Sequence, residues 1–280
     1  MPEFDYSKLT LMNDFLFSTV MHKKEFCIPM LELILGVKIK DLKYHSTQET
    51  VIADIPESKS VRLDVYAEDD NDTVYDIEVQ TSSNGNLPRR TRMYQSMIDA
   101  RALQEGEDYR KLNRSYVIFI CNFDPFRKDR YMYSFRARCE EDDDIYLDDG
   151  AYRIILNVNG SIGEISDGLK EFVRYMATGR TTGDYTKKLD NEVDLVRNDR
   201  KWRHEYMTLA QKFIECEDVG MHKLWVRLVR KKIDQLDIYE MQEMFDIPSD
   251  DCQEIIDVIN AHPDWTDEKV AETIQWEDWK

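Results

Sequence analysis

Two acidic side chains on neighbouring predicted strands have the spacing of a metal site. The alternating residues 60–68 and 73–81 predict two strands, and residues 70–72 predict a three-residue hairpin loop between them. With that loop, Asp64 lies directly across from Glu78, and facing Cβ atoms are about 4.5–5.5 Å apart. We therefore expect the two carboxylates to share one face of the sheet.

Two carboxylates this close repel each other unless a proton or a cation lies between them. A hard divalent ion such as Mg²⁺ or Mn²⁺ suits the pair, because it uses one or two carboxylates together with water and substrate phosphate. Gln80 follows Glu78 on the same face and is placed to orient a metal-bound water, although it has no titratable group and cannot be a strong general base. The alternative is that both acids belong to a solvated face.

The segment after the hairpin offers basic side chains for a phosphate. Residues 88–104 predict a helix with Pro88 in its first turn. Arg89 and Arg92 share a face of this helix, near Tyr94, and guanidinium groups suit bidentate phosphate contacts. Cations at a helix N-terminus oppose its dipole, so a nearby anion would stabilise them. We expect these three side chains to bind phosphate; the alternative is a solvated basic first turn.

Hydrophobic periodicity predicts the elements that position these residues. Residues 13–35 are expected to form one helix, capped by Asn13 and ended by Gly36. The continuous apolar run 115–121 predicts a strand buried on both faces in the centre of a sheet. Strands are expected at residues 47–54, 60–68, 73–81, 115–121, 131–139 and 151–158. The apolar stripe of the helix over 88–104 is expected to be Met93, Met97, Ala100 and Leu103.

The rest of the chain is expected to be helical, at residues 165–178, 186–217 and 221–234 and in short helices beyond them. This order predicts an α/β (or α+β) fold, in which a mixed sheet flanked by helices precedes a helical C-terminal region. We expect a domain over 1–180, a helical connector over 181–234 and a small acidic module over 235–280.

The net charge is −18, which taken as a mean disfavours a nucleic acid as partner. The charge is unevenly distributed. Residues 88–138 carry 12 basic and 6 acidic side chains, whereas residues 237–280 carry 14 acids and two lysines. DNA contacts are therefore expected from the N-terminal domain alone.

Residues 238–250 look like the first helix and turn of a helix-turn-helix. The following helix would present Asp250, Asp251 and Glu254, and phosphates would repel these carboxylates. We expect this module to bind a protein partner or to form a homo-oligomer.

Five cysteines without a C-x-x-C pair indicate reduced thiols. The chain has no apolar stretch of the roughly 20 residues that a membrane span needs, and no signal-peptide pattern at its start. We expect a cytoplasmic protein.

From about residue 13 to residue 160, the order and spacing of several motifs resemble the PD-(D/E)XK nuclease family transposases, a bacterial branch also described as recombination-promoting nucleases. The segments that carry the resemblance are Asn13-Asp14-Phe15-Leu16-Phe17, Arg62-Leu63-Asp64-Val65, Asp76-Ile77-Glu78-Val79-Gln80, Arg89-Arg90-x-Arg92-x-Tyr94, Leu103-Gln104-x-Gly106-x-x-Tyr109-x-x-Leu112 and Val117-Ile118-Phe119-Ile120-Cys121-x-Phe123-Asp124-Pro125-Phe126.

The resemblance implies a restriction-endonuclease-like fold that cleaves DNA with Mg²⁺ (or Mn²⁺) at one sheet edge. Asp64 and Glu78 would hold the metal, and Asp14 resembles an accessory acid of the first helix, although a first-turn acid is also favoured by the helix dipole. The sequence departs from the superfamily pattern in two places. Leu63 stands where a Pro is usual, and Gln80 stands where a Lys helps to position water and to stabilise charge; the transposase branch resembles this chain in carrying Gln.

Three functions fit these observations. The first is a metal-dependent DNA endonuclease of a mobile element. The second is a catalytically degenerate nuclease fold that acts as a binding or regulatory protein, for which Gln80 and the acidic composition are arguments. The third is a structural partner protein whose carboxylates are only solvated.

Overall fold

The computed structural model describes residues 6–44, 64–83, 86–103, 106–245, 247–274 and 276. The chain forms two compact units, of which one is Asp5–Arg200 and the other contains Lys201–Lys280. The domain limits expected from the sequence, after residues 180 and 234, stay predictions. The expected strand 47–54 and residues 60–63 of the next one lie outside the described residues.

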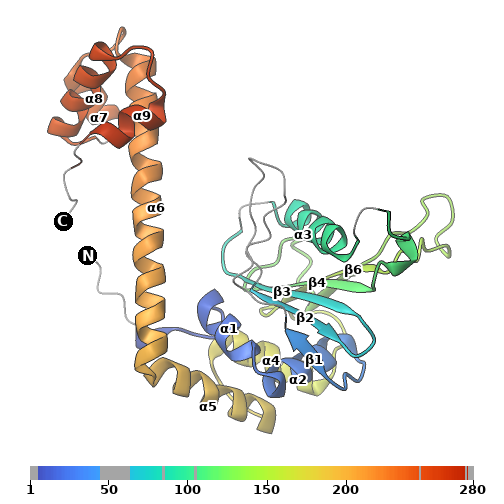
Figure 1. The fold of residues 1–280 in the computed structure, drawn as a ribbon. Helices are drawn as coiled ribbons and strands as arrows, with labels where there is room; N and C mark the ends of the chain where they lie inside the picture. Colours follow the sequence, from blue (N-terminus) through green and yellow to red (C-terminus); the bar gives the residue numbers. More distant parts are fainter. Residues whose placement is uncertain are drawn as a thin grey trace. The chain divides into compact units, whose positions relative to one another are not determined.

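The first unit is built on a six-stranded mixed sheet, as the sequence predicts (Figure 1). Its order is β1-β2-β3-β4-β6-β5. Strands β1, β2 and β3 are antiparallel, β3, β4 and β6 are parallel, and β5 is antiparallel to β6 at the edge. The strands are β1 (Leu42–Tyr44), β2 (Val65–Asp69), β3 (Val74–Gln80), β4 (Ser115–Cys121), β5 (Met132–Phe135) and β6 (Ala151–Asn157).

Helices cover both faces of this sheet. Figure 1 shows α3 on one face and α1, α2 and α4 on the other. Tyr94 and Met97 of α3 pack against Val117 and Phe119 of β4, and Val74 of β3 belongs to the same cluster. Side chains alternate along a strand, so the even-numbered residues of β3 point to the α3 face. The helices of this unit are α1 (Asp14–Met21), α2 (Lys24–Leu35), α3 (Leu87–Ala102), α4 (Asp167–Thr178) and α5 (Asp184–Asn198), with 3-10 turns at Tyr6–Lys8 and Tyr109–Lys111.

The central strand and the first helix cap agree with the sequence prediction. β4 pairs in parallel with β3 and β6, and all but one of its residues are buried. The side chain of Asn13 accepts a hydrogen bond from Leu16 N–H at 3.1 Å, and Gly36 ends α2 with φ +69°. The expected single helix 13–35 is two helices, because Lys23 is extended and its carbonyl begins a new turn by accepting from Phe26 and Cys27.

The helix breaks expected after residue 178 also differ from the observed ones. The chain is extended at Asp199, between α5 and α6 (Arg200–Lys232), in the middle of the expected helix 186–217. The break expected near Gly220 is absent, since α6 continues through it. A single glycine costs a helix only about 1 kcal/mol relative to alanine, and the neighbouring residues favour the helix.

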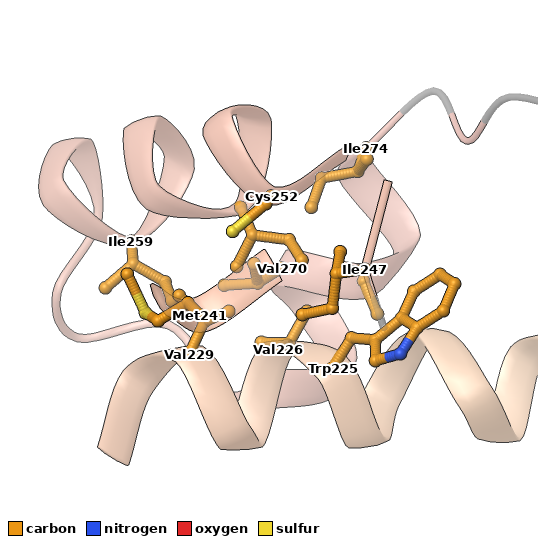
Figure 2. Packing of buried hydrophobic residues seen from close by; sticks show 11 residues of the cluster. Trp225, Val226, Val229, Met241, Ile247, Cys252, Ile259, Val270 and Ile274 are labelled. Atoms are coloured by element: carbon orange, nitrogen blue, oxygen red, sulfur yellow. The ribbon is translucent and has the colours of Figure 1, made fainter. Parts of the chain in front are cut away.

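The C-terminal unit has its own core, formed by the end of α6 with three short helices (Figure 2). Trp225, Val226 and Val229 of α6 are buried against residues of all three. Arg230 fixes the arrangement by donating to Asp267 Oδ1 at 2.9 Å and to the carbonyl of Trp265 at 2.9 Å. The short helices are α7 (Ile238–Phe245), α8 (Ser249–Ala261) and α9 (Asp267–Thr273).

Candidate metal and nucleic-acid site

The hairpin that carries the two predicted ligands has the predicted register. Val65 faces Ile77 and Tyr66 faces Asp76, so one further step places Asp64 opposite Glu78. The site therefore lies on the sheet face that α3 covers.

The turn that sets this register is closed by one side chain. Asp69 accepts hydrogen bonds from the backbone of Asn71 and Thr73 and from the hydroxyl of Tyr75, at 2.8–2.9 Å. Asp72 takes a left-handed conformation, with φ +59°, as the last residue of a three-residue hairpin loop often does. These local hydrogen bonds thus stabilise the three-residue loop that the sequence predicts.

Asp64 and Glu78 are tied together through the backbone. Asp64 N–H donates to Glu78 Oε1 at 2.9 Å, and Val79 N–H donates to Asp64 Oδ2 at 3.2 Å. The hydroxyl of Ser18 donates to the Asp64 carbonyl at 2.8 Å, which connects α1 to the same point. These bonds hold the two acids beside each other, with Glu78 only 3% exposed and Asp64 half-buried.

A third acid, Asp76, lies on the same face and is 0% exposed. Neither of its carboxylate oxygens has a hydrogen-bond partner among the described residues. Burial raises the pKa of Asp76 well above its usual value, and the charge of Asp64 raises it further. Strand alternation already groups Asp76 with Glu78, but its burial beneath α3 is not visible in the sequence.

The pKa of Glu78 is also raised well above its usual value. Burial is the main cause, followed by the charges of Asp64 and Asp76, while the Asp64 N–H and the Arg90 guanidinium act in the opposite direction. Asp76 and Glu78, whose ionisation is disfavoured next to Asp64, form with it a site that favours a proton or a cation.

Gln80 lies at the end of β3 with both ends of its amide engaged. Arg90 Nη1 donates to Gln80 Oε1, and Gln80 Nε2 donates to the Ser82 carbonyl at 2.9 Å. Arg90 Nη2 also donates to the Tyr94 hydroxyl at 2.8 Å and lies 3.6 Å from Glu78 Oε2. Gln80 therefore connects the acidic face to an arginine.

The basic helix presents a different face from the expected one. Arg89 and Arg92 are exposed, whereas Tyr94 is buried and Arg90 points to the acids. The expected apolar stripe is displaced in the same way, because Met93 is 41% exposed. The buried residues of α3 are Leu87, Thr91, Tyr94, Gln95, Met97 and Ile98.

Arg90 belongs to one of the motifs quoted above but was given no role in the site, because the inner face of the helix was predicted from apolar residues alone. The i,i+4 spacing between Arg90 and Tyr94 is the signal that identifies it, since one turn of helix brings the two side chains together.

Asp14 begins α1 as expected, and its carboxylate accepts from the N–H of Phe15 at 2.8 Å on the exposed side of that helix. Among the residues that the structure describes, no three His, Cys, Asp or Glu side chains form a group able to hold a metal by themselves. The accessory role of Asp14 stays a prediction.

The donor set nevertheless fits Mg²⁺ or Mn²⁺. All of its donors are carboxylate oxygens, Asp64 and Glu78 adjoin, and the buried oxygens of Asp76 have no hydrogen-bond partner within the described part of the chain. Mg²⁺ commonly binds through one or two carboxylates and completes its shell with water and substrate phosphate. A site of this kind needs no third protein ligand.

The first unit thus presents paired acids on a mixed sheet, beside an arginine of the covering helix α3. The family model described as PD-(D/E)XK nuclease family transposase matches residues 11–163, which is more than half of the chain. The chain belongs to this family, and the resemblance expected from the motifs is confirmed. No curated protein and no solved structure gives a match. None of the described helices is long and apolar enough to cross a membrane.

Proposed function

We propose that the unit Asp5–Arg200 is a Mg²⁺- or Mn²⁺-dependent DNA endonuclease that hydrolyses phosphodiester bonds for a mobile element. The observation that carries the proposal is the pairing of Asp64 with Glu78 on a buried sheet face, with backbone N–H groups holding both carboxylates. Family membership supports the same reaction class.

In this proposal Asp64 and Glu78 hold the metal, and Asp14 is an accessory acid. A bound divalent ion supplies Lewis acidity and lowers the pKa of its water. Gln80 helps to orient that water through the oxygen that Arg90 also contacts. Arg89, Arg92 and Tyr94 are the expected phosphate-binding residues; Arg89 and Arg92 are exposed on α3 and Tyr94 is buried. We place the DNA backbone along this helix.

The test is cleavage of supercoiled and linear DNA with Mg²⁺, Mn²⁺ or Ca²⁺. Wild-type protein should nick DNA with Mg²⁺ or Mn²⁺, and Asp64→Ala and Glu78→Ala should not. Cleavage that survives in Asp64→Ala would exclude the assigned roles.

A second candidate is a nuclease fold that has lost catalysis and acts as a binding or regulatory protein. The engaged amide of Gln80, where a charged group is usual in the superfamily, favours it. Calorimetry separates the candidates, because absence of Mn²⁺ binding at millimolar concentration, together with absence of cleavage, would support the second.

For the C-terminal unit we propose a protein partner or a second copy of the chain rather than DNA. Residues 237–280 contain 14 acids and two lysines, and phosphate would be repelled by that excess. The test is to compare DNA binding by the full chain with its oligomeric state in solution.

A further inference from the structure

We propose that Arg90 binds the DNA phosphate beside the acids of the candidate site and supplies the positive charge that Gln80 lacks. The proposal rests on the proposed function, because it assigns a DNA phosphate as the ligand. The face beside it carries three acids, Asp64, Asp76 and Glu78, whose carboxylates repel an anionic substrate when they are ionised. A fixed cation at this place offsets that repulsion.

The guanidinium of Arg90 is held in place on several sides. It donates to Gln80 Oε1 and to the Tyr94 hydroxyl, and its central carbon lies 5.2 Å from the centre of the Phe119 ring. Its Nη2 lies 3.6 Å from Glu78 Oε2. An arginine preorganised in this way loses little side-chain entropy when it binds a further anion.

The guanidinium also has donors left for a ligand. An arginine has five N–H donors, and the bonds to Gln80 and Tyr94 account for two of them. The side chain is 29% exposed, so it is accessible from one side although its other side is packed. Bidentate contact with phosphate is a geometry that guanidinium favours.

A cavity of about 120 Å³ opens beside Arg90. A water molecule takes roughly 30 Å³ of liquid volume, so the cavity has room for a group of several heavy atoms. The polar part of its lining offers hydroxyls and amides that can contact a phosphodiester, and the rest, which is mostly apolar, includes one aromatic ring for a sugar or base. These lining residues include Gln80, Ser82, Ser83, Asn86, Arg90 and Phe123.

The roles of positions 80 and 90 are therefore coupled. Gln80 is neutral and accepts a hydrogen bond from Arg90, so the charge resides on the helix and the amide holds it. A lysine at position 80 would place an ammonium where the guanidinium now lies. In the Gln80→Lys variant the new ammonium should repel Arg90. In the Gln80→Lys/Arg90→Met variant the ammonium should replace the missing guanidinium charge.

The experiment measures two quantities for wild type, Arg90→Met, Arg90→Lys, Gln80→Lys and Gln80→Lys/Arg90→Met. One is Mg²⁺-dependent cleavage, resolved into kcat and KM; the other is anisotropy of a fluorescein-labelled DNA duplex in EDTA. Methionine keeps apolar contact with Phe119, and thermal unfolding checks that each variant folds. Arg101→Met, at the opposite end of α3, is the matched control.

We expect Arg90→Met to lower kcat by about 10²–10³, the usual loss when one charge-stabilising donor is removed. It should also weaken duplex binding in EDTA several-fold, whereas Arg101→Met changes neither quantity. Arg90→Lys should recover part of both. As a single substitution, Gln80→Lys should lower the cleavage rate. Added to Arg90→Met, it should raise the rate above that of Arg90→Met.

Two failures are distinguishable. If the wild type does not cleave DNA with any of the metals tested, the proposed function is wrong. Duplex binding in EDTA then still decides the role of Arg90. The assignment of Arg90 is wrong if Arg90→Met binds the duplex as tightly as Arg101→Met does. If the wild type cleaves DNA, equal cleavage by these two variants is also required for that conclusion.

Discussion

The carboxylates of Asp64 and Glu78 each accept a hydrogen bond from the backbone of the opposite strand segment. Glu78 on β3 accepts from the N–H of Asp64 at 2.9 Å, and Asp64 accepts from the N–H of Val79 at 3.2 Å. Each acid is thus fixed by the backbone of the opposite strand rather than by its own packing. Carboxylates held by N–H donors keep their geometry when a metal binds, which reduces the reorganisation that binding requires.

Asp64→Asn and Glu78→Gln keep the acceptor oxygen for these N–H donors but remove the charge. We expect each to lower Mg²⁺-dependent nicking at least about 100-fold and to abolish Mn²⁺ binding in calorimetry, because a neutral amide is a poor ligand for a hard cation. Asp70→Asn, in the exposed turn of the same hairpin, is the control and should behave as wild type. Retained Mn²⁺ affinity in Asp64→Asn would contradict the ligand assignment.

Asp76 gives stability a defined pH dependence in the absence of metal. Its pKa is raised in the folded state, so the folded chain binds more protons than the unfolded chain above about pH 4, the ordinary aspartate pKa. Stability therefore falls as pH rises from there through the folded-state pKa. Asp76→Asn has no charge to bury.

Denaturant unfolding in EDTA tests this at pH 4 to 8. The Asp76→Asn variant should be more stable than wild type near pH 8, and the difference should shrink on acidification. A difference that does not change with pH, or a variant less stable at pH 8, would show that Asp76 is ionised at little cost.

Arg89→Met and Arg92→Met test the exposed side of α3. If each side chain contacts one phosphate, each substitution lowers the magnitude of the salt slope of DNA binding by about 0.9, because one fewer counterion is released. Both positions are exposed, so the free energy of unfolding should change by less than about 0.5 kcal/mol. Anisotropy titrations at several salt concentrations measure the slope. Unchanged slopes would confine phosphate binding to other residues.

Asp14→Asn tests the accessory acid. We expect Mn²⁺ affinity to fall several-fold, less than in Asp64→Asn, and stability to fall by roughly 0.3–1 kcal/mol because an acid in the first turn of α1 is lost. Calorimetry and thermal unfolding of one preparation give both numbers. A loss of stability with unchanged metal affinity would leave only the helix-dipole role.

Ile255→Ala tests the core of the C-terminal unit. Ile255 is fully buried in a cluster that includes Val226 of α6, so we expect a loss of about 2–5 kcal/mol in the stability of that unit. The partly buried neighbour Ile256 should cost less when replaced by Ala. DNA binding and cleavage should stay unchanged. Reduced DNA binding by Ile255→Ala would place DNA contacts on the acidic unit.

The hairpin, β4 and the helix cap at Asn13 were predictable because local rules decide them. Loop length sets a hairpin register, a continuous apolar run indicates a strand buried on both faces, and a side-chain acceptor begins a helix. In each of these cases the observed tertiary contacts agree with the local preference.

The inner face of α3 was not predictable in the same way. Arg90 and Gln95 face inward because the acids, Ser115 and Tyr94 provide partners that no hydropathy pattern registers. The apolar residue Met93 is exposed in their place. Polar residues that face the candidate site displace the apolar stripe of this helix, so hydrophobic periodicity misplaces them.

The turn closed by Asp69 has a consequence for how this site can be lost. If the loop took one residue more or fewer from this same chain, the pairing register of β2 and β3 would shift, and different residues would face each other. Side chains on a strand alternate between faces. Either Asp64 would then leave Glu78, or Val65 would leave the core. A family member that keeps every acid but pairs these two strands in another register would therefore separate the two carboxylates, and a motif comparison alone would not detect the difference.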